Sequence, residues 1–319
     1  MNLSKKLSVS VIMPVYNGES TLPKTLGSLW KQKDYFEELI IINDGSTDNS
    51  ENAIHEFLKN KSGWQLIKNP KNLGLAKSYN AGLRSARGDL IVTLHQDVVL
   101  VDGALEKLTA VFQNEKVVAA SHKVSHPWEI WNKYNFWEKC FFARQAGKIQ
   151  SGIDGKFDGF RRRALLEAGL FDEKHFRSAG EDGDMVFKLK RIGKIIQTDA
   201  EIIHLHKIDN DFRYQDIIYK QKQYSEAQGA LLGLGRIRNP INIFKSFFRE
   251  ILLIGLFIPY VQILAALLIV IYSFWYTEII FLKEYHDKRI LILPVLNVYL
   301  LLVSFVYSLK GFIYGKQKI

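Results

Sequence analysis

The sequence predicts an α/β protein with an open, doubly wound and mostly parallel sheet, followed by two C-terminal transmembrane helices. Two observations lead to this architecture. In the first third of the 319-residue chain, short apolar runs alternate with segments of helical spacing. From Ile251 onward the chain is a near-continuous run of Leu, Ile, Val, Phe and Tyr. Repeated strand–helix units imply parallel strands with right-handed crossovers, and an apolar run of about 20 residues can span a bilayer.

The alternating part of the chain divides into strand–helix pairs. We expect strands at Val9–Pro14, Leu39–Ile42, Gln65–Lys68 and Leu90–Leu94. We expect helices at Leu22–Trp30, Asp48–Lys59, Leu75–Ala86 and Gly103–Phe112. Ser46 or Thr47 is positioned to cap the second of these helices. In sheets of this kind ligands bind at the carboxyl ends of the strands, so the loops that follow them are the expected location of a site.

Two apolar segments near the C-terminus are long enough to be membrane spans. The first is Ile251–Leu282 and the second is Ile290–Leu309, with the charged connector Lys283–Arg289 between them. Hydrophobic core helices and a re-entrant hairpin are the alternative interpretations. Basic residues precede the first run and follow the second, so we expect the main domain and the C-terminus to face the cytosol.

The composition narrows the class of partner. A formal net charge of +10 suits anionic partners such as nucleotide phosphates, lipid phosphates or an anionic leaflet. Nucleic acid is the rival partner, and the sequence disfavours it because it contains no recognised basic helix or RNA-binding motif. The single cysteine, Cys140, excludes an internal disulfide, and its aromatic neighbours predict an inert thiol. Residues 1–6 form a short polar segment, which predicts no signal peptide.

Polar clusters follow two of the predicted strands. Asn43–Ser46 comes after one apolar run, and His95–Asp97 comes after another. An aspartate after a strand is often only a turn or capping residue. Two such residues, Asp44 and Asp97, at adjacent ends of one sheet favour a pair that faces a ligand.

A third acidic cluster, Gly180–Asp184, opens a predicted helix. Acidic residues at a helix N-terminus commonly cap amide groups and oppose the helix dipole. This cluster has three carboxylates in four positions. A cap needs only one carboxylate, so at least one of the three has another role.

Taken in order, six short motifs resemble those of glycosyltransferase family 2, and especially its membrane-anchored rhamnosyl-type and envelope-glycan branch. The motifs are Met13–Asn17, Asn43–Ser46, Asn72–Ala76, Gln96–Asp97, Gly169–Glu173 and Glu181–Asp182. Each motif alone is weak, but all six in order over roughly residues 8–207 are specific. The resemblance implies a GT-A fold and an inverting transferase that uses a nucleoside-diphosphate sugar.

The resemblance also implies a nucleotide-sugar site. The implied donor-binding residues are Pro14, Tyr16, Asn17, Glu19, Asp44, Gly74, Lys77, Gln96 and Asp97. Pro14, Tyr16 and Asn17 would close the strand-to-loop turn that holds the nucleotide, with Glu19 beside them. Asp44 would accept hydrogen bonds from the base or the ribose, which suits a carboxylate.

A divalent metal is part of the implied chemistry, as Mn²⁺ or Mg²⁺. Asp97 matches the last carboxylate of the family's Asp-x-Asp motif, and the first Asp is replaced by His95. His204 and His206 resemble the C-terminal histidine that completes the metal shell, with His204 favoured; ordinary strand polarity is the alternative. An imidazole in the shell suits Mn²⁺ somewhat better than Mg²⁺.

The implied general base is Asp182, with Glu181 positioning it or contacting the acceptor. Inversion requires in-line attack, so a base must lie opposite the diphosphate and accept the proton of the acceptor hydroxyl. Arg161–Arg163 would bind phosphates or, equally, remain solvated. The aromatic segment Ser125–Phe142 fits a membrane boundary, a core helix or an acceptor groove.

The expected organisation follows from these observations. Residues 1–210 form the catalytic domain, 211–250 a helical linker with an interfacial amphipathic helix, and 251–319 a multi-pass membrane anchor. The expected partners are a nucleoside-diphosphate sugar, a lipid-linked or glycan acceptor and membrane lipids, without nucleic acid. The alternatives are a polyprenyl-phosphate sugar synthase and a non-catalytic nucleotide-sugar-binding membrane protein. A Rossmann dehydrogenase is disfavoured because no Gly-x-Gly-x-x-Gly follows the first strand.

Overall fold

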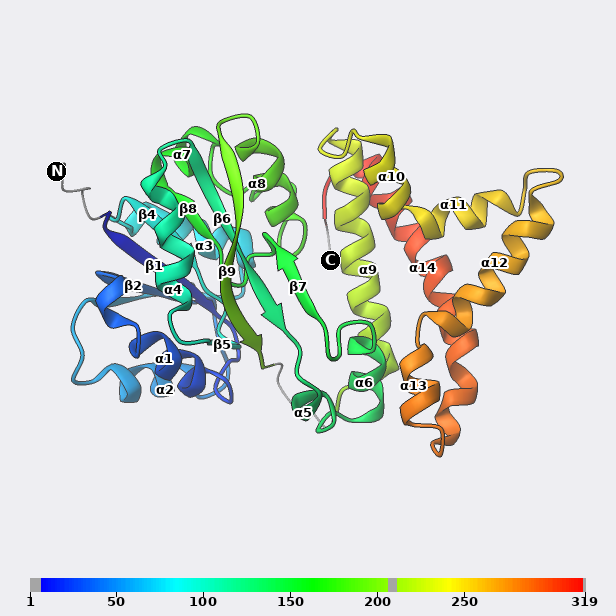
Figure 1. The fold of residues 1–319 in the computed structure, drawn as a ribbon, viewed down its shortest axis with the longest axis horizontal. Helices are drawn as coiled ribbons and strands as arrows, with labels where there is room; N and C mark the ends of the chain where they lie inside the picture. The colour runs from blue at the N-terminus through cyan, green and yellow to red at the C-terminus, as the bar shows by residue number, and fades with distance from the viewer. Residues whose placement is uncertain (1–6, 206–210, 318–319) are drawn as a thin grey trace. The chain divides into compact units, whose positions relative to one another are not determined.

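The computed structural model describes residues 7–205 and 211–317, and its elements are drawn in Figure 1. Contacts group the chain into two units. The first unit contains the described residues of the ranges 1–127, 147–173 and 181–207. The second contains those of the ranges 128–146, 174–180 and 208–319.

The first unit is built on one mixed β-sheet. Its strands are β1 (Val9–Val15), β2 (Glu38–Asn43), β3 (Trp64–Lys68), β4 (Leu90–Thr93), β5 (Val98–Leu100), β6 (Val117–Ser125), β7 (Ile149–Gly152), β8 (Gly159–Arg161) and β9 (Lys194–His204). Their order in the sheet is β3-β2-β1-β4-β8-β6-β9-β5, and β7 pairs with β6.

The helices of this unit lie on both faces of the sheet. They are α1 (Leu22–Trp30), α2 (Ser50–Leu58), α3 (Leu75–Ser85), α4 (Ala104–Ala110), α7 (Arg162–Glu167) and α8 (Glu181–Leu189), with 3₁₀ turns at Lys33–Tyr35 and Val111–Gln113. The strand–helix alternation predicted for the first third is confirmed, with boundaries within two residues. The sheet itself is mixed rather than mostly parallel, which corrects the expectation. β8 pairs antiparallel with both β4 and β6, and β5 pairs antiparallel with β9.

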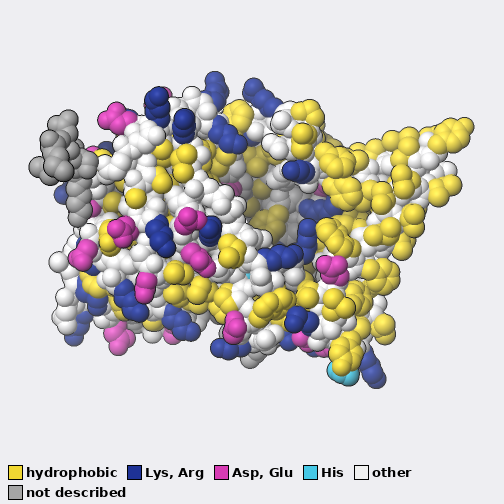
Figure 2. Space-filling model, in the orientation of Figure 1, with side chains coloured by type: hydrophobic (Ala, Val, Ile, Leu, Met, Phe, Trp, Pro, Cys, Tyr) yellow, Lys and Arg dark blue, Asp and Glu magenta, His cyan; other side chains and the backbone are white. Residues whose placement is uncertain are grey.

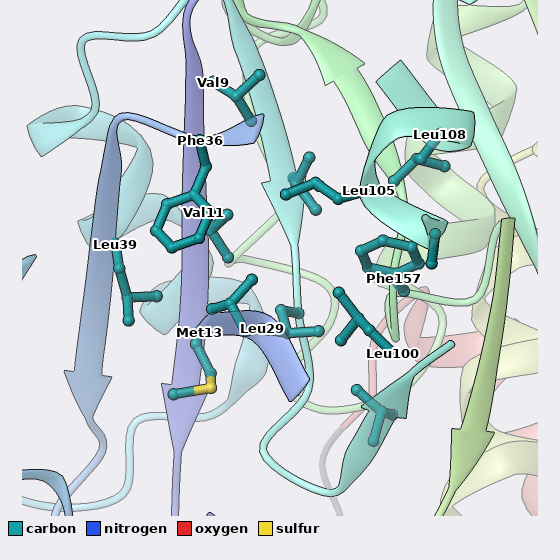
Figure 3. Close-up of a cluster of buried hydrophobic side chains, with 14 of the residues drawn as sticks. Val9, Val11, Met13, Leu29, Phe36, Leu39, Leu100, Leu105, Leu108 and Phe157 are labelled. Carbon is teal, nitrogen blue, oxygen red and sulfur yellow. The ribbon is translucent and has the colours of Figure 1, made fainter. Parts of the chain in front are cut away.

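Burial on both faces explains why β1 and β2 read as continuous apolar runs. Every residue of β1 is buried. Successive side chains point to opposite faces of a strand, so Val11 and Met13 pack with α1 and α4 while Ile12 packs with α3. Figure 3 shows the first of these clusters, where Leu29, Leu105 and other labelled side chains cover β1. This packing fixes the strand ends from which the site loops start.

The second unit is helical. Its helices are α5 (Trp128–Trp131), α6 (Phe136–Phe142), α9 (Tyr214–Gly233), α10 (Pro240–Ser246), α11 (Phe248–Gly255), α12 (Gln262–Trp275), α13 (Glu278–Lys283) and α14 (Leu293–Tyr314), with a 3₁₀ turn at Lys288–Ile292. The aromatic segment forms part of its core, because Trp131, Tyr134 and Phe136 are buried with Leu296 and Leu300 of α14. Of the three interpretations of this segment, a core role is therefore the one observed.

The first predicted membrane span is not one helix. The run divides into α11, α12 and α13, and the break between α11 and α12 contains Pro259 and Tyr260. Pro259 has no N–H to donate, and Tyr260 has a left-handed φ of 67°. At the C-terminal end of α12, Asn297 of α14 donates to the carbonyl of Ser273 at 2.7 Å and to the hydroxyl of Thr277 at 3.0 Å. The Ser273 carbonyl, near the break between α12 and α13, thus has a hydrogen-bond partner.

One stretch of the described residues, Lys288–Tyr314, is long and apolar enough to cross a membrane, judged by length and composition alone. Two spans are therefore not confirmed. Figure 2 shows hydrophobic side chains gathered over α11, α12 and the loop between them. Polar side chains of α14 instead face inward, since Ser304 and Ser308 are buried and donate to Glu250 at 2.6 and 2.9 Å. The two hydroxyl groups and the Glu250 carboxylate thus satisfy one another inside the helical unit.

Candidate functional site

Gln96 joins the loops that follow β1 and β4. Its side-chain oxygen accepts the backbone N–H of Tyr16 at 2.9 Å, and its amide nitrogen donates to the Tyr16 carbonyl at 2.9 Å. The Tyr16 side chain is exposed, whereas Pro14 before it is buried in β1. Gln96 therefore holds the predicted nucleotide turn through its backbone and leaves the Tyr16 ring accessible.

The loops after β1 and β2 are also tied together. Asn17 has a left-handed φ of 51°, and its side-chain oxygen accepts the N–H of Thr47 at 2.8 Å. The N–H of Asn17 donates to the Ser46 hydroxyl at 3.1 Å. Glu19 accepts the N–H of Asn49 at 3.2 Å. These contacts arrange the two loops side by side at the carboxyl edge of the sheet, as the sequence predicts.

Asp44 is buried at the end of β2 and organises the loop that leads into α3. One of its oxygens accepts the N–H of Leu73 at 2.9 Å and the side-chain amide of Asn69 at 2.7 Å, and the other accepts the N–H of Gly74 at 2.9 Å. Gly74 has a left-handed φ of 93° immediately before α3, a conformation that favours glycine. Lys77 is exposed on the first turn of α3. The nucleotide-binding roles of these residues stay predictions.

Asp97 lies between two histidines. Its oxygens are 3.3 Å from Nε2 of His204 and 3.9 Å from Nδ1 of His95. The antiparallel pairing of β5 with β9 produces this proximity, because Val98 is opposite His204 in the register. The other predicted ligand, His206, lies outside the described residues.

His95 has the properties of a neutral ligand. Burial lowers the pKa of His95 to about 4, although the Asp97 charge opposes the shift. The ring is therefore unprotonated at neutral pH. Its Nε2 atom is buried and has no hydrogen-bond partner among the described residues. A neutral imidazole nitrogen beside a carboxylate fits a divalent cation such as Mn²⁺.

His126, at the end of β6, is a histidine that the sequence did not single out. Its ring centroid is 6.1 Å from that of His204. Burial lowers the pKa of His126 to about 4, and the nearby His204 acts in the same direction. The pairing of β6 with β9 brings the two histidines close together, because it places Ser125 opposite Ile203. The sequence alone contains no signal for that pairing, so it could not have identified His126.

A second cluster joins His122 of β6 to the loop before β8. The two ring nitrogens of His122 lie 3.1 Å from Asp158 and 3.4 Å from Asp154. Asp158 is buried, and its second oxygen accepts the N–H groups of Asp154 and Gly155 at 3.1 and 2.7 Å. One ligand atom from each of the three residues lies within 4.8 Å of the others, so this group is a second candidate cation site. The sequence patterns predict none of these roles.

The three carboxylates at the start of α8 have different surroundings. Asp184 is buried and pairs with Lys188 at 2.6 Å, which makes it a structural residue. Burial raises the pKa of Glu181 to about 8, and the charge of Asp182 adds to the shift. Burial also raises the pKa of Asp182 to about 6; the Gly183 N–H opposes this shift, and the charges of Asp154 and Asp158 reinforce it. At neutral pH the adjacent pair Glu181–Asp182 thus favours one ionised and one protonated carboxyl.

Acidic residues from three segments of the chain act electrostatically on Tyr79 of α3. The charges of Glu181, Asp158, Asp154 and Asp97 all act to raise the pKa of the Tyr79 hydroxyl, after the larger effect of burial. This hydroxyl donates to the Gly155 carbonyl at 2.8 Å. Asp97 and the acidic start of α8 therefore belong to one region. Asp44 joins the same edge of the sheet, because β1 lies between the strands that carry Asp44 and Asp97.

Arg161 has a structural role rather than a phosphate-binding one. It is buried, and its guanidinium donates to the carbonyls of Val117 and Asn114 at 2.8 and 3.1 Å and to that of Phe112. Arg163 is exposed. Arg161, the first residue of the basic run Arg161–Arg163, thus binds backbone carbonyls around β6.

The fold and the site define the class, and sequence comparison defines the family. The mixed sheet and its acidic carboxyl edge are those of a GT-A-like α/β protein. The chain belongs to glycosyltransferase family 2, whose model, described as Glycosyl transferase family 2, matches residues 10–168. An uncharacterized glycosyltransferase of Haemophilus influenzae is 39% identical over 111 residues, 34% of this chain and 44% of its own length.

A poly-beta-1,6-N-acetyl-D-glucosamine synthase of Staphylococcus epidermidis is 30% identical over 174 residues, 51% of this chain and 42% of its own length. The chain thus spans less than half the length of these curated relatives. Among solved structures, a mannosyltransferase from Pyrobaculum calidifontis in complex with GDP-Man and Mn²⁺ has a TM-score of 0.59 at 16% identity, covering 95% of this chain and 87% of its own. A glucosyl-3-phosphoglycerate synthase from Mycobacterium tuberculosis, with Mn²⁺ and UDP, has a TM-score of 0.51 at 17% identity over 73% of this chain and 80% of its own. Likeness at these identities concerns the fold.

Proposed function

We propose that this protein is an inverting glycosyltransferase that moves a sugar from a nucleoside-diphosphate sugar to a lipid-linked or envelope-glycan acceptor at the cytosolic face of a membrane. The observation that carries the proposal is the placement of Asp182, beside the buried Glu181 at the start of α8, in the same region as the Asp97–His204 pair. Burial raises the pKa of Asp182. A base whose pKa lies near the working pH is suited to proton removal in the transition state.

The donor binds at the loops after β1, β2 and β4 and at the start of α3. Its binding residues are Pro14, Tyr16, Asn17, Glu19, Asp44, Gly74, Lys77, Gln96 and Asp97. The exposed ring of Tyr16 is available to stack on the base. Structures of similar fold contain GDP-Man or UDP, which supports a nucleotide donor here.

A divalent metal would be held by Asp97, His204 and His95. This donor set fits because His95 is neutral, its buried Nε2 has no partner among the described residues, and a carboxylate lies beside it. When bound, the ion neutralises charge on the leaving diphosphate. His206 is the further ligand expected from the sequence. The Mn²⁺ in two structures of similar fold supports this choice of ion.

Asp182 accepts the proton from the acceptor hydroxyl. The hydroxyl oxygen forms the new bond to the anomeric carbon from the side opposite the diphosphate, whose bond to that carbon breaks, so the configuration inverts. Protonated Glu181 keeps a second negative charge away from Asp182. Glu181 thereby lets Asp182 remain ionised while the nucleoside diphosphate leaves.

Membrane attachment is assigned to the helical unit. Large apolar side chains are exposed on α12 and α14, for example Leu267, Phe274 and Leu302. We propose the boundaries 1–210, 211–250 and 251–319 for the catalytic, linking and anchoring parts, with α14 as one span and α11 to α13 as the region that replaces the other predicted span. Basic residues at both ends of this region favour a cytosolic catalytic part.

A donor screen with the purified protein tests the function. Release of nucleoside diphosphate is measured with a panel of nucleotide-sugars, with a lipid-linked glycan or bare polyprenyl phosphate as the acceptor. Transfer to the glycan supports the proposal, and transfer to bare polyprenyl phosphate would instead assign the related synthase activity. Binding of nucleotide-sugar without any transfer would contradict the proposal and indicate a non-catalytic nucleotide-sugar-binding protein.

A further inference from the structure

The segment Lys174–Gly180 leads directly into α8 and is held by the far end of the chain. The side-chain oxygen of Gln317 accepts the backbone N–H groups of Arg177, Ser178 and Ala179 at 3.0, 3.0 and 3.2 Å. The backbone N–H of Gln317 also donates to the carbonyl of His175 at 2.7 Å. Gln317 is only 6% exposed. Four hydrogen bonds therefore connect one buried residue to this segment.

An apolar contact fixes the same segment. Phe176 is 2% exposed and packs with Ala230 and Leu231 of α9. Gly180 has a left-handed φ of 88°, and a Cβ there would come within 2.8 Å of the Phe176 ring and 3.1 Å of the Ala227 side chain. Only glycine fits this position without displacement. The segment is thus anchored in the helical unit along its whole length.

Three successive N–H groups directed at one oxygen form a specific acceptor site. Backbone N–H groups away from water need a partner, and in this segment a single side chain supplies it for three of them. The segment ends at Gly180, one residue before Glu181 and two before Asp182. The backbone that Gln317 orders is therefore continuous with the backbone that carries the proposed base.

We infer that Gln317 is a positioning residue for Asp182. Gln317 acts by fixing the segment Lys174–Gly180. The inference rests on the proposed function, since it assigns a residue to the same reaction. Loss of the acceptor oxygen would leave three N–H groups unsatisfied and release the backbone before the base.

The experiment compares two substitutions of similar size in the full-length protein. Gln317→Met keeps the length of the side chain and removes the acceptor, whereas Gln317→Glu keeps an acceptor oxygen for the three N–H groups. Lys316→Ala, at an exposed neighbouring position, is the matched control. For each variant, kcat, the donor KM and amide hydrogen exchange at residues 177–179 are measured.

We expect kcat of Gln317→Met to fall by about 10- to 100-fold, the cost of a catalytic group misplaced by about 1 Å. The donor KM should stay unchanged, and amide exchange at residues 177–179 should accelerate. Gln317→Glu should restore both kcat and exchange protection, which a general loss of stability would not allow. Equal kcat values for the Met and Glu variants, or unchanged exchange in Gln317→Met, would overturn the inference. An inactive wild-type protein would refute the proposed function instead, and the exchange measurement would still decide whether Gln317 orders the segment.

Discussion

Replacement of Asp182 by Asn tests the proposed base most directly. Asn keeps the shape of the side chain and an oxygen for the Gly183 N–H, which lies 2.7 Å from Asp182, but it cannot accept a proton. General base catalysis typically contributes about 10²- to 10⁴-fold, so kcat should fall by a factor in this range. Nucleotide binding should survive, because the proposed donor residues lie on other segments.

The raised pKa of Asp182 sets the expected pH dependence. Asp182 must be ionised to act as a base, so activity should increase as the pH rises through about 6. A group with this pKa is roughly 10% ionised at pH 5 and roughly 90% at pH 7, which predicts kcat/KM about tenfold lower at pH 5. Asp154→Asn removes a negative charge that raises the Asp182 pKa. That variant should shift the acidic limb of the profile to lower pH.

The assay is release of nucleoside diphosphate in the presence of acceptor, measured across the pH range, with calorimetry for nucleotide binding. Asp199→Asn is a suitable control, since the Asp199 side chain is 82% exposed and pairs with Lys123 at the surface. The reasoning fails if Asp182→Asn retains wild-type kcat. It also fails if the wild-type profile is flat between about pH 5 and about pH 7, where a base of this pKa must titrate.

Four further predictions concern the metal site, the membrane contact and the hydrophobic core. Asp97→Ala should weaken metal-dependent donor binding by about 10-fold or more, and indifference of binding to both chelator and substitution would remove the metal assignment. His95→Asp restores the family's first carboxylate and should shift the preference from Mn²⁺ toward Mg²⁺, read as the ratio of kcat/KM with the two ions; an unchanged ratio would place His95 outside the metal shell. Leu267→Asp combined with Phe274→Asp should reduce co-sedimentation with phospholipid vesicles without lowering nucleotide affinity, and full co-sedimentation would exclude α12 from the membrane contact. Leu26→Ala, in the buried core, should lower the free energy of unfolding by about 2–5 kcal/mol in denaturant titrations, whereas a loss below about 1 kcal/mol would contradict the packing of α1.

Local sequence patterns predicted much of the fold and part of the candidate site. β1 and β2 are buried on both faces and so read as apolar runs, and the helices that follow them were placed within two residues. The proximity of Asp97 to His204 and the acidic start of α8 were also anticipated, through the resemblance of their motifs. The strands, the helices and the acidic start of α8 are readable because burial and helical spacing repeat over a few residues. The proximity of Asp97 to His204 was expected only from the family resemblance.

Long-range pairing was not readable in the same way. β8 has only three residues, too few to show a period, yet its antiparallel insertion between β4 and β6 makes the sheet mixed. That insertion also brings the loop bearing Asp154 and Asp158 to His122, and no sequence pattern predicts this cluster. The end of α12 within the Ile251–Leu282 run likewise has a distant partner, because Asn297 of α14 donates to the Ser273 carbonyl and the Thr277 hydroxyl.

The amino-acid sequence by itself determined the strand–helix alternation, the acidic loop ends and the apolar C-terminal region, because each depends on neighbouring residues. The tertiary structure alone decided which distant side chains share a location: His126 beside His204, Asp154 near Asp182, and Gln317 on the segment before α8. Such contacts require the closure of long loops, and the free energy for closing them comes from the packing of the whole unit rather than from local residue preferences.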